Sequence, residues 1–300
     1  MAGTLDPATT RARRTWRRQF VRLYVVAFVV TLIPFGFALG VPAMEARNLA
    51  RAIAERTETA RTALLHGELE TAIGTATTVL DADPSSERAQ AIRVNALFER
   101  FWATKSNADL RAARLAAAKL QTSRDSEALV ARGNLAMIDG DPKQAVTLMT
   151  DAVAADPSDA YAHHQLGFAL NEAGKSEESL THLKQALGLA PKMEWVQRNL
   201  ANVLAKLGRC DERIEGLVPE ATATCHDEVG AAAYNAGKAA EARRHFERAV
   251  QLAGNVGGFH ANLAISLLAT GDRQGAYQHA MQARKLGVKE HPVFEPLGIR

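Results

Sequence analysis

A 34-residue pattern that occurs twice between Ser126 and Pro191 constrains this 300-residue chain more than any other feature. The first copy starts at Ser126 and the second at Ala160. Small or chain-breaking residues recur at this step: Gly133 and Gly167, Gly140 and Gly174, Ala152 and Ala186, Pro157 and Pro191. A fixed period of roughly 20–50 residues is typical of a solenoid, in which each repeat packs only against its neighbours.

Each copy predicts two helices joined by a tight turn. In the first copy, apolar residues recur at helical spacing over 126–139 and 142–155. Gly140 stands where the first helix ends, and Asp141-Pro142 stands where the second begins. Gly133 and Ala145 are small where the two antiparallel helices must approach closely. One such hairpin cannot bury its own apolar face, so the copies must stack.

These residues, at this spacing, resemble the tetratricopeptide repeat, whose signature runs roughly Trp, Leu-Gly, Tyr, Ala, Phe, Ala and Pro. The resemblance implies an all-α solenoid of helical hairpins with a concave face. In the same register, further copies start at Ile53, Glu87, Glu194, Ala223 and Gly257, which makes about seven.

Two copies are irregular. The copy over Glu87–Asp125 has 39 residues, and we expect the extra ones in a longer hairpin at 104–107. In the copy from Glu194, Gly216 and Pro219 are expected to cut the second helix to about two turns. We therefore expect the solenoid to cover 45–290, followed by a tail over 291–300 that lies against the last helix.

The N-terminal 44 residues predict a membrane anchor. Leu23–Met44 carries no charged residue and, at about 1.5 Å a residue, is long enough for a transmembrane helix. Residues 1–22 hold six arginines and one aspartate, a net +5 that predicts a cytoplasmic N-terminus, and the rest of the chain is about −2. We expect the repeats on the periplasmic side of a bacterial inner membrane. A body without a basic stripe argues against nucleic-acid binding.

Cleaved export signals are the alternatives to an anchor. Val41-Pro42-Ala43 could be a cleavage site, and Arg17-Arg18 resembles the start of a twin-arginine signal. The apolar run is longer than a signal peptide's, which favours the anchor. Gly36 and Gly40 have the spacing of a helix-dimer motif, but glycine is common in membrane helices, so a homodimer is not favoured.

Cys210 and Cys225 are the two cysteines of the chain, and they bracket the irregular copy. Outside the cytoplasm they would close a 15-residue loop as a disulfide. Two free thiols are the competing interpretation. A metal site at Cys225-His226 lacks further ligands.

The concave face of the resembled family is formed by the first helix of each repeat. Its positions correspond here to Asn95, Asn134, Tyr161, His164, Phe168, Asn171, Trp195, Arg198, Asn202, Lys206, Tyr234 and Asn235, with Phe98, Met137 and Asp227 beside them. Amides can bind the main chain of an extended peptide, and aromatic side chains offer apolar pockets. The alternative is that these residues are merely tolerated in a structural groove. Trp195, Arg198 and Asn202 share one side of a helix and are expected to lie exposed there.

No motif for catalysis, a cofactor or a metal is found, so we expect a protein that is not an enzyme. The predicted function is an anchored scaffold or adaptor that binds other proteins or peptide segments. In architecture it resembles the anchored repeat proteins of secretion, cytochrome maturation or envelope assembly. The alternative is a permanent structural subunit of an inner-membrane complex, held mainly through the transmembrane helix.

Overall fold

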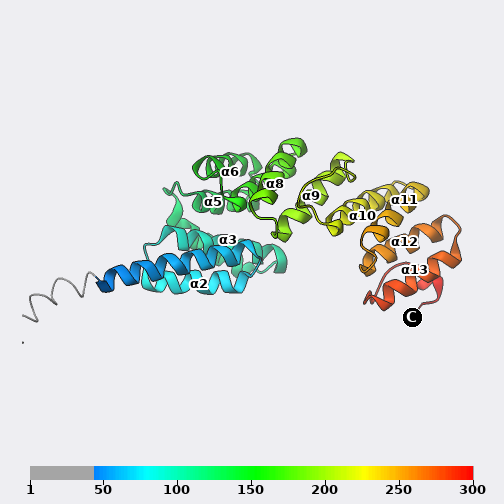
Figure 1. Cartoon of the computed structure of the whole chain (residues 1–300), viewed down its shortest axis with the longest axis horizontal. Coiled ribbons are helices and arrows are strands. Elements are labelled where there is room, and N and C mark those ends of the chain that lie inside the picture. Colours follow the sequence, from blue (N-terminus) through cyan, green and yellow to red (C-terminus); the bar gives the residue numbers. More distant parts are fainter. Residues whose placement is uncertain (1–43, 300) are drawn as a thin grey trace, which may run out of the picture. The chain divides into compact units, whose positions relative to one another are not determined.

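The computed structural model describes residues 44–299, and every regular element in that range is a helix (Figure 1). The chain divides into two compact units, 1–56 and Thr57–Arg300. Of the first unit, residues 44–56 are described and are helical, and this helix runs on to residue 65. The predicted anchor with Gly36 and Gly40, and the arginine cluster, lie outside the described residues. No helix within 44–299 is long and apolar enough to span a bilayer.

The second unit is a series of helical hairpins. Its helices are α2 (Leu69–Ala82), α3 (Glu87–Thr104), α4 (Asn107–Ala117), α5 (Ser126–Ile138), α6 (Pro142–Ala155), α7 (Ala160–Glu172), α8 (Ser176–Leu189), α9 (Glu194–Leu207), α10 (Pro219–Asn235), α11 (Ala239–Leu252), α12 (Gly257–Ala269) and α13 (Arg273–Lys285). Antiparallel pairs are formed by α3 and α4, α5 and α6, α7 and α8, α10 and α11, and α12 and α13. Each pair packs on the next, except that the single helix α9 lies between α8 and α10. The predicted all-α repeat fold is confirmed.

The central hairpins match their sequence pattern to within one residue at each end. Asp141 caps α6 by accepting from the backbone N–H of Gln144 at 2.9 Å, and Pro142 occupies the first turn. Close packing explains the small residues: a Cβ atom on Gly167 would lie 2.7 Å from Cγ of Leu183 on the facing helix. The residues that begin the helices and the residues that pack between them therefore predict the same hairpins in this part of the chain.

The turn of the second hairpin differs from the prediction. Other hairpins turn through a left-handed glycine, such as Gly140 at φ 78° and Gly174 at φ 79°, but here Lys105 takes that conformation at φ 57°. The turn is only Lys105–Ser106, so the longer hairpin expected at 104–107 is wrong. The extra residues lengthen α3 to 18 residues and form a 3₁₀ turn at Ala118–Leu120 with the link to α5.

The helix after α9 is missing. Residues 208–218 contain no helix, so the expected two-turn helix is wrong, and Pro219 starts α10 in place of ending a helix. The side chain of Gln197 holds this segment: its Nε2 donates to the Gly216 carbonyl at 2.8 Å, and its Oε1 accepts from the Val218 N–H at 3.1 Å. Cys210 and Cys225 form a disulfide across it, with Cα atoms 5.6 Å apart.

The C-terminal tail lies against the last hairpin, as its position in the sequence suggested. Val293, Phe294 and Leu297 are buried in one cluster with the alanines of α13. The guanidinium of Arg273 donates to the Pro296 carbonyl at 2.9 Å, and the Arg284 guanidinium lies over the Phe294 ring. The tail thus covers the apolar end of the solenoid.

Candidate functional site

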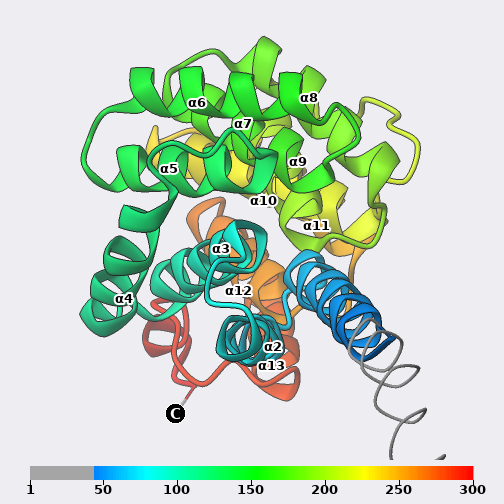
Figure 2. The same cartoon turned by 90° about the vertical axis from the view of Figure 1, so that its left-hand side faces the viewer.

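Helix α3 packs on α5, the inner helix of the next repeat (Figure 2). Its Glu99 reaches α7, two repeats further on, where Oε1 accepts from the Tyr161 hydroxyl at 2.9 Å and from Gln165 Nε2 at 2.5 Å. Next to it, Asn95 donates to the Glu127 carbonyl, and Asn134 donates to Asn95 Oδ1 at 3.1 Å. The concave face is therefore partly filled by the chain itself.

A cleft of about 370 Å³ remains between α3, α7 and α9. Four aromatic side chains line it: Phe98, Trp102, Phe168 and Trp195. Trp102 stands edge-on to Phe168 with ring centroids 6.5 Å apart, and it keeps 41% of its surface exposed. The polar lining is Glu99, His164, Gln165, Glu172, Arg198 and Asn199. The cleft thus combines aromatic walls with a few polar groups, as ligand sites usually do.

Two ionisable groups sit in the wall of this cleft, the half-buried Glu99 and the buried His164. Burial raises the pKa of Glu99 to about 7, opposed by the hydrogen bonds from Tyr161 and Gln165 and by Arg198. Burial and then the charge of Arg198 lower the pKa of His164 to about 3, so this ring is neutral. Asn199 Nδ2 donates to His164 Nε2 at 2.8 Å, which leaves the hydrogen on Nδ1, and Nδ1 has no partner. That Nδ1 atom is itself closed off from solvent, so its lack of a partner is a cost within the fold.

The predicted groove residues separate into three groups. His164, Phe168, Trp195 and Arg198 line the cleft. Asn95, Asn134 and Tyr161 are buried between helices and bond to the chain's own groups, although Oδ1 of Asn134 has no partner. Their role in binding stays a prediction.

The third group lies beyond the cleft. On α7 and α9, Lys206 Nζ donates to Asn171 Oδ1 at 3.2 Å, and Asn171 Nδ2 donates to Asn202 Oδ1 at 3.4 Å. Tyr234 and Asn235 stand at the end of α10, and Tyr234 packs against the cluster of the last two hairpins. These five residues do not join the aromatic cleft.

Sequence reasoning missed five of the residues that line the cleft: Glu99, Trp102, Gln165, Glu172 and Asn199. A signal for Trp102 was present, since Phe98, Phe101 and Trp102 continue an aromatic face beyond the normal length of a first helix. Trp195, expected to be exposed, is half-buried: its ring lies 3.6 Å from where a Cβ of Gly67 would be and stacks on His164. The contact between the first and the fifth repeat cannot be predicted from a pattern that repeats every 34 residues.

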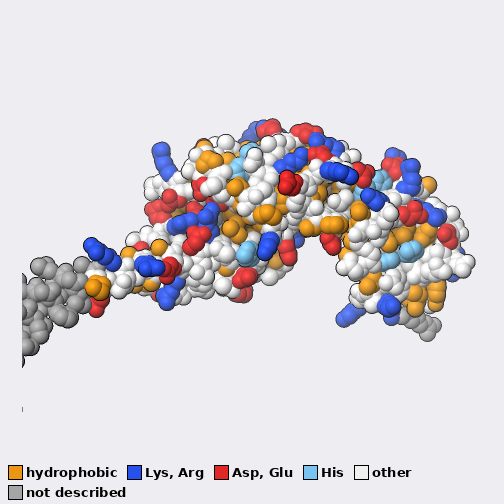
Figure 3. Space-filling view, viewed as in Figure 1, with side chains coloured by type: hydrophobic (Ala, Val, Ile, Leu, Met, Phe, Trp, Pro, Cys, Tyr) orange, Lys and Arg blue, Asp and Glu red, His pale blue; other side chains and the backbone are white. Residues whose placement is uncertain are grey.

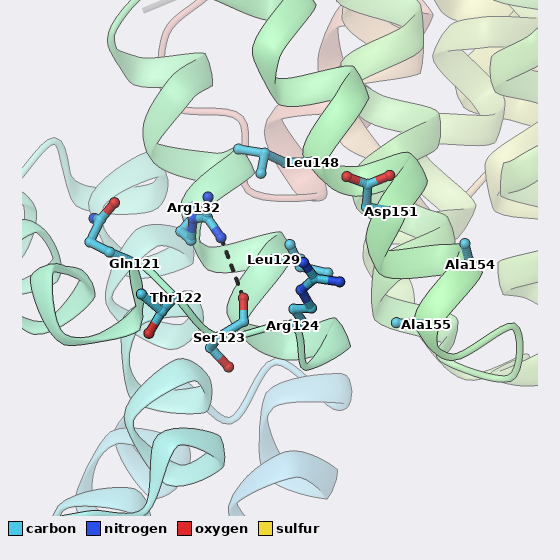
Figure 4. Close-up of a pocket in the computed structure, with 10 residues that line it drawn as sticks. All are labelled: Gln121, Thr122, Ser123, Arg124, Leu129, Arg132, Leu148, Asp151, Ala154 and Ala155. Carbon is cyan, nitrogen blue, oxygen red and sulfur yellow. Dashed lines mark hydrogen bonds between the residues drawn. The ribbon is translucent and has the colours of Figure 1, made fainter.

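A second hollow, of about 820 Å³, is lined by residues of the 121–124 link and of α5 and α6 (Figure 4). Arg132 Nη1 donates to the Ser123 carbonyl at 3.4 Å there, and Leu129 and Leu148 form part of the lining. In the described part of the chain no three His, Cys, Asp or Glu side chains gather as metal ligands. Charged side chains of both signs are interspersed over the face shown in Figure 3.

Comparisons with known proteins identify one repeat and several similar folds. The family model of the tetratricopeptide repeat matches residues 160–193. No curated protein matches the chain. The APC/C hetero-tetramer Cut9–Hcn1 is 15% identical over 79% of this chain and 47% of that chain, with a TM-score of 0.45.

Two smaller structures are also similar. MamA from residue 41 of Desulfovibrio magneticus RS-1 is 18% identical over 54% of this chain and 94% of its own, with a TM-score of 0.37. YrrB, described as a TPR protein with an unusual peptide-binding site, is 16% identical over 60% of this chain and 95% of its own, with a TM-score of 0.35.

Proposed function

We propose that this tetratricopeptide-repeat protein is a scaffold that binds a segment of a partner protein in the cleft between α3, α7 and α9. The observation that carries the proposal is the convergence of Phe98, Trp102, Phe168 and Trp195 on one cleft. Large aromatic side chains dominate the affinity of many protein interfaces, and here four of them line one cleft. The repeat fold and the lack of any catalytic motif agree with a binding role.

The cleft favours a partner with an apolar or aromatic anchor side chain. Trp102 and Phe168 present ring edges and faces to that side chain. Arg198 and Glu172 are exposed at the rim, where charges of both signs set orientation more than affinity.

We further propose that the scaffold is anchored in a bacterial inner membrane and works on its periplasmic side, in secretion, cytochrome maturation or envelope assembly. Support comes from the sequence: the uncharged run Leu23–Met44 follows an arginine cluster. The two cysteines, bonded between 210 and 225, suit an oxidising compartment.

Paired alanine substitutions test the cleft. Trp102→Ala with Arg198→Ala removes an exposed anchor and a rim charge, and both side chains are accessible. The melting temperature should change little, whereas proteins that co-purify with the wild type should be lost. Trp195→Ala is a poorer test, since that ring packs on Gly67 and His164.

The matched control is Tyr277→Ala, which removes an equally exposed aromatic side chain (48%) from α13, far from the cleft in sequence. It should keep every partner. If the cleft variant also keeps every partner while remaining folded, the proposal fails.

Extraction in mild detergent followed by sizing separates a scaffold from a permanent subunit. A scaffold should elute largely free, with partners present in less than equal amounts. A fixed stoichiometric assembly that persists in the Trp102 and Arg198 variant would favour the structural-subunit alternative, with contacts through the membrane segment.

A further inference from the structure

Six of the nine histidines form three pairs at the same place in three hairpins. The pairs are His163–His182, His226–His245 and His260–His279, with partners 19 residues apart. The first member comes from the inner helix (α7, α10 or α12) and the second from the outer helix (α8, α11 or α13). The Nδ1 atoms lie 3.1, 3.2 and 2.8 Å apart, which is hydrogen-bond distance.

The rings of each pair meet head-on. The ring centroids are 5.3, 5.5 and 5.1 Å apart. In every pair, the distance between centroids exceeds the distance between the two Nδ1 atoms by about two ring radii. The two nitrogens therefore lie near the line between the rings, as in a straight N–H···N bond. Such a contact leaves no room for a metal ion between the nitrogens.

The first ring of each pair is fixed by a second contact. Nε2 of His163 faces the Pro157 carbonyl at 3.2 Å, and Nε2 of His260 faces the Gly254 carbonyl at 3.0 Å. Nε2 of His226 faces Asp211 Oδ1 at 3.3 Å. A carbonyl or carboxylate oxygen only accepts, so Nε2 carries the hydrogen and Nδ1 of a neutral first ring is the acceptor. The second ring must then donate from its own Nδ1.

This arrangement sets how many protons a pair can hold. The second ring is half-exposed, so its Nε2 can take one proton while its Nδ1 still donates. A further proton must go to Nδ1 of the first ring, which breaks the bond and leaves two like charges about 3 Å apart. The closed pair therefore accepts one proton and not two.

Neighbouring charges differ between the pairs. Glu178 acts on the first pair, Asp211 and Arg248 on the second, and Glu247 and Asp272 on the third. Burial, followed by the partner ring, lowers the pKa of His182 and of His279 in spite of these acids. Burial also lowers the pKa of His226, with Asp211 opposing. Groups with lowered pKa values stabilise the fold above their unfolded pKa, near 6.5, and lose that contribution as the pH falls.

We propose that the three histidine pairs are proton-binding sites that hold their hairpins closed near neutral pH and release them in mild acid. The chain contains its own comparison. In the hairpin of α5 and α6, Leu129 and Leu148 stand 34 residues before His163 and His182, and an apolar pair there cannot titrate (Figure 4). In the irregular copy, Gln197 takes the place of the first histidine and donates to the Pro191 carbonyl.

A six-leucine variant tests the proposal in the full-length protein. Replacing all three pairs by leucine copies the α5–α6 arrangement. Between pH 7 and pH 5, the melting temperature of the wild type should fall by several degrees relative to that of this variant. Glu99 and all other titrating groups are common to both proteins, so their effects cancel in the difference. An equal change in the two proteins overturns the proposal.

A second variant with more conservative substitutions tests the same proposal if the six leucines impair folding. His182→Gln, His245→Gln and His279→Gln retain a donor for the first ring without a titrating second ring, and should flatten the same pH dependence. Nitrogen-15 NMR of the wild type supplies a direct readout: three pairs of Nδ1 atoms should show scalar coupling through the hydrogen bond at pH 7 and lose it in acid. Uncoupled rings at pH 7 would rule the pairs out.

Discussion

Glu99 connects two repeats that are not neighbours in sequence, and its charge state matters for that contact. Glu99 is half-buried, and Tyr161 and Gln165 donate to the same oxygen of its carboxyl group. Because its pKa is raised above the unfolded value of 4.5 to about 7, its stabilising contribution is present below 4.5 and is lost as the pH rises to about 7.

Glu99→Gln should remove this dependence, since an amide oxygen can accept both bonds without a charge. Relative to the wild type, the variant should gain up to about 3 kcal/mol between pH 5 and pH 8. Urea unfolding at the two pH values measures it. Glu172→Gln, an exposed carboxylate of the same cleft, is the control and should show almost no such gain.

Two glycines of neighbouring helices should respond in opposite ways to alanine. Gly167→Ala puts a methyl group 2.7 Å from Leu183 Cγ and should destabilise the protein by about 1–3 kcal/mol. Gly188→Ala, in α8 with nothing within 4 Å of its Cβ position, should stabilise it by about 0.5–1 kcal/mol. Equal effects in thermal unfolding would contradict the close approach of α7 and α8.

The sequence predicts such local contacts well, and distant ones poorly. Gly167 recurs at the 34-residue step because every hairpin has the same close approach, so its role could be inferred from the repeat. Tyr161 was assigned to an open groove, and nothing in its own repeat shows that Glu99 covers it. The cleft is made by contacts between repeats, which no single copy encodes.

The segment 208–218 replaces a helix, and its stability depends on few contacts. Both cysteine side chains of the disulfide are buried, and Arg209 pairs with Glu177 and Glu212. Pro219 was expected to end a helix, but it begins α10, because proline both ends helices and favours their first turn. By contrast, Gly140 could only end a helix and Pro142 could only begin one, so the end of α5 and the start of α6 were predicted closely.

Cys210→Ala with Cys225→Ala should lower the free energy of unfolding by about 3 kcal/mol, the value expected for a closed 15-residue loop. A reducing agent should bring the wild type to the same stability and leave the variant unchanged. The non-reduced protein should contain no titratable thiol. Two free thiols in protein taken directly from the cell envelope would exclude the bond.

At the scale of the whole protein, the proposed anchor predicts on which side of a membrane the repeats lie. The arginine cluster before Leu23 predicts that a reporter fused after Arg300 is active only if it works outside the cytoplasm. The mature protein should retain residues 23–44. Activity of a cytoplasmic reporter would overturn the orientation, and an N-terminus at Met44 would mean a cleaved signal.

The cleft also restricts how such a chain can change its number of repeats over evolution. Its walls come from the second, fourth and fifth repeats, so one hairpin gained or lost between α4 and α7 would carry Tyr161 and Phe168 away from Glu99 and Trp102. Duplication, the usual way in which solenoids lengthen, would destroy the site there. Beyond α10 no residue contributes to the cleft, and hairpins could be added or removed without cost to it. Relatives should therefore differ in length at the C-terminal end of the array and keep a constant count of repeats from α3 to α9.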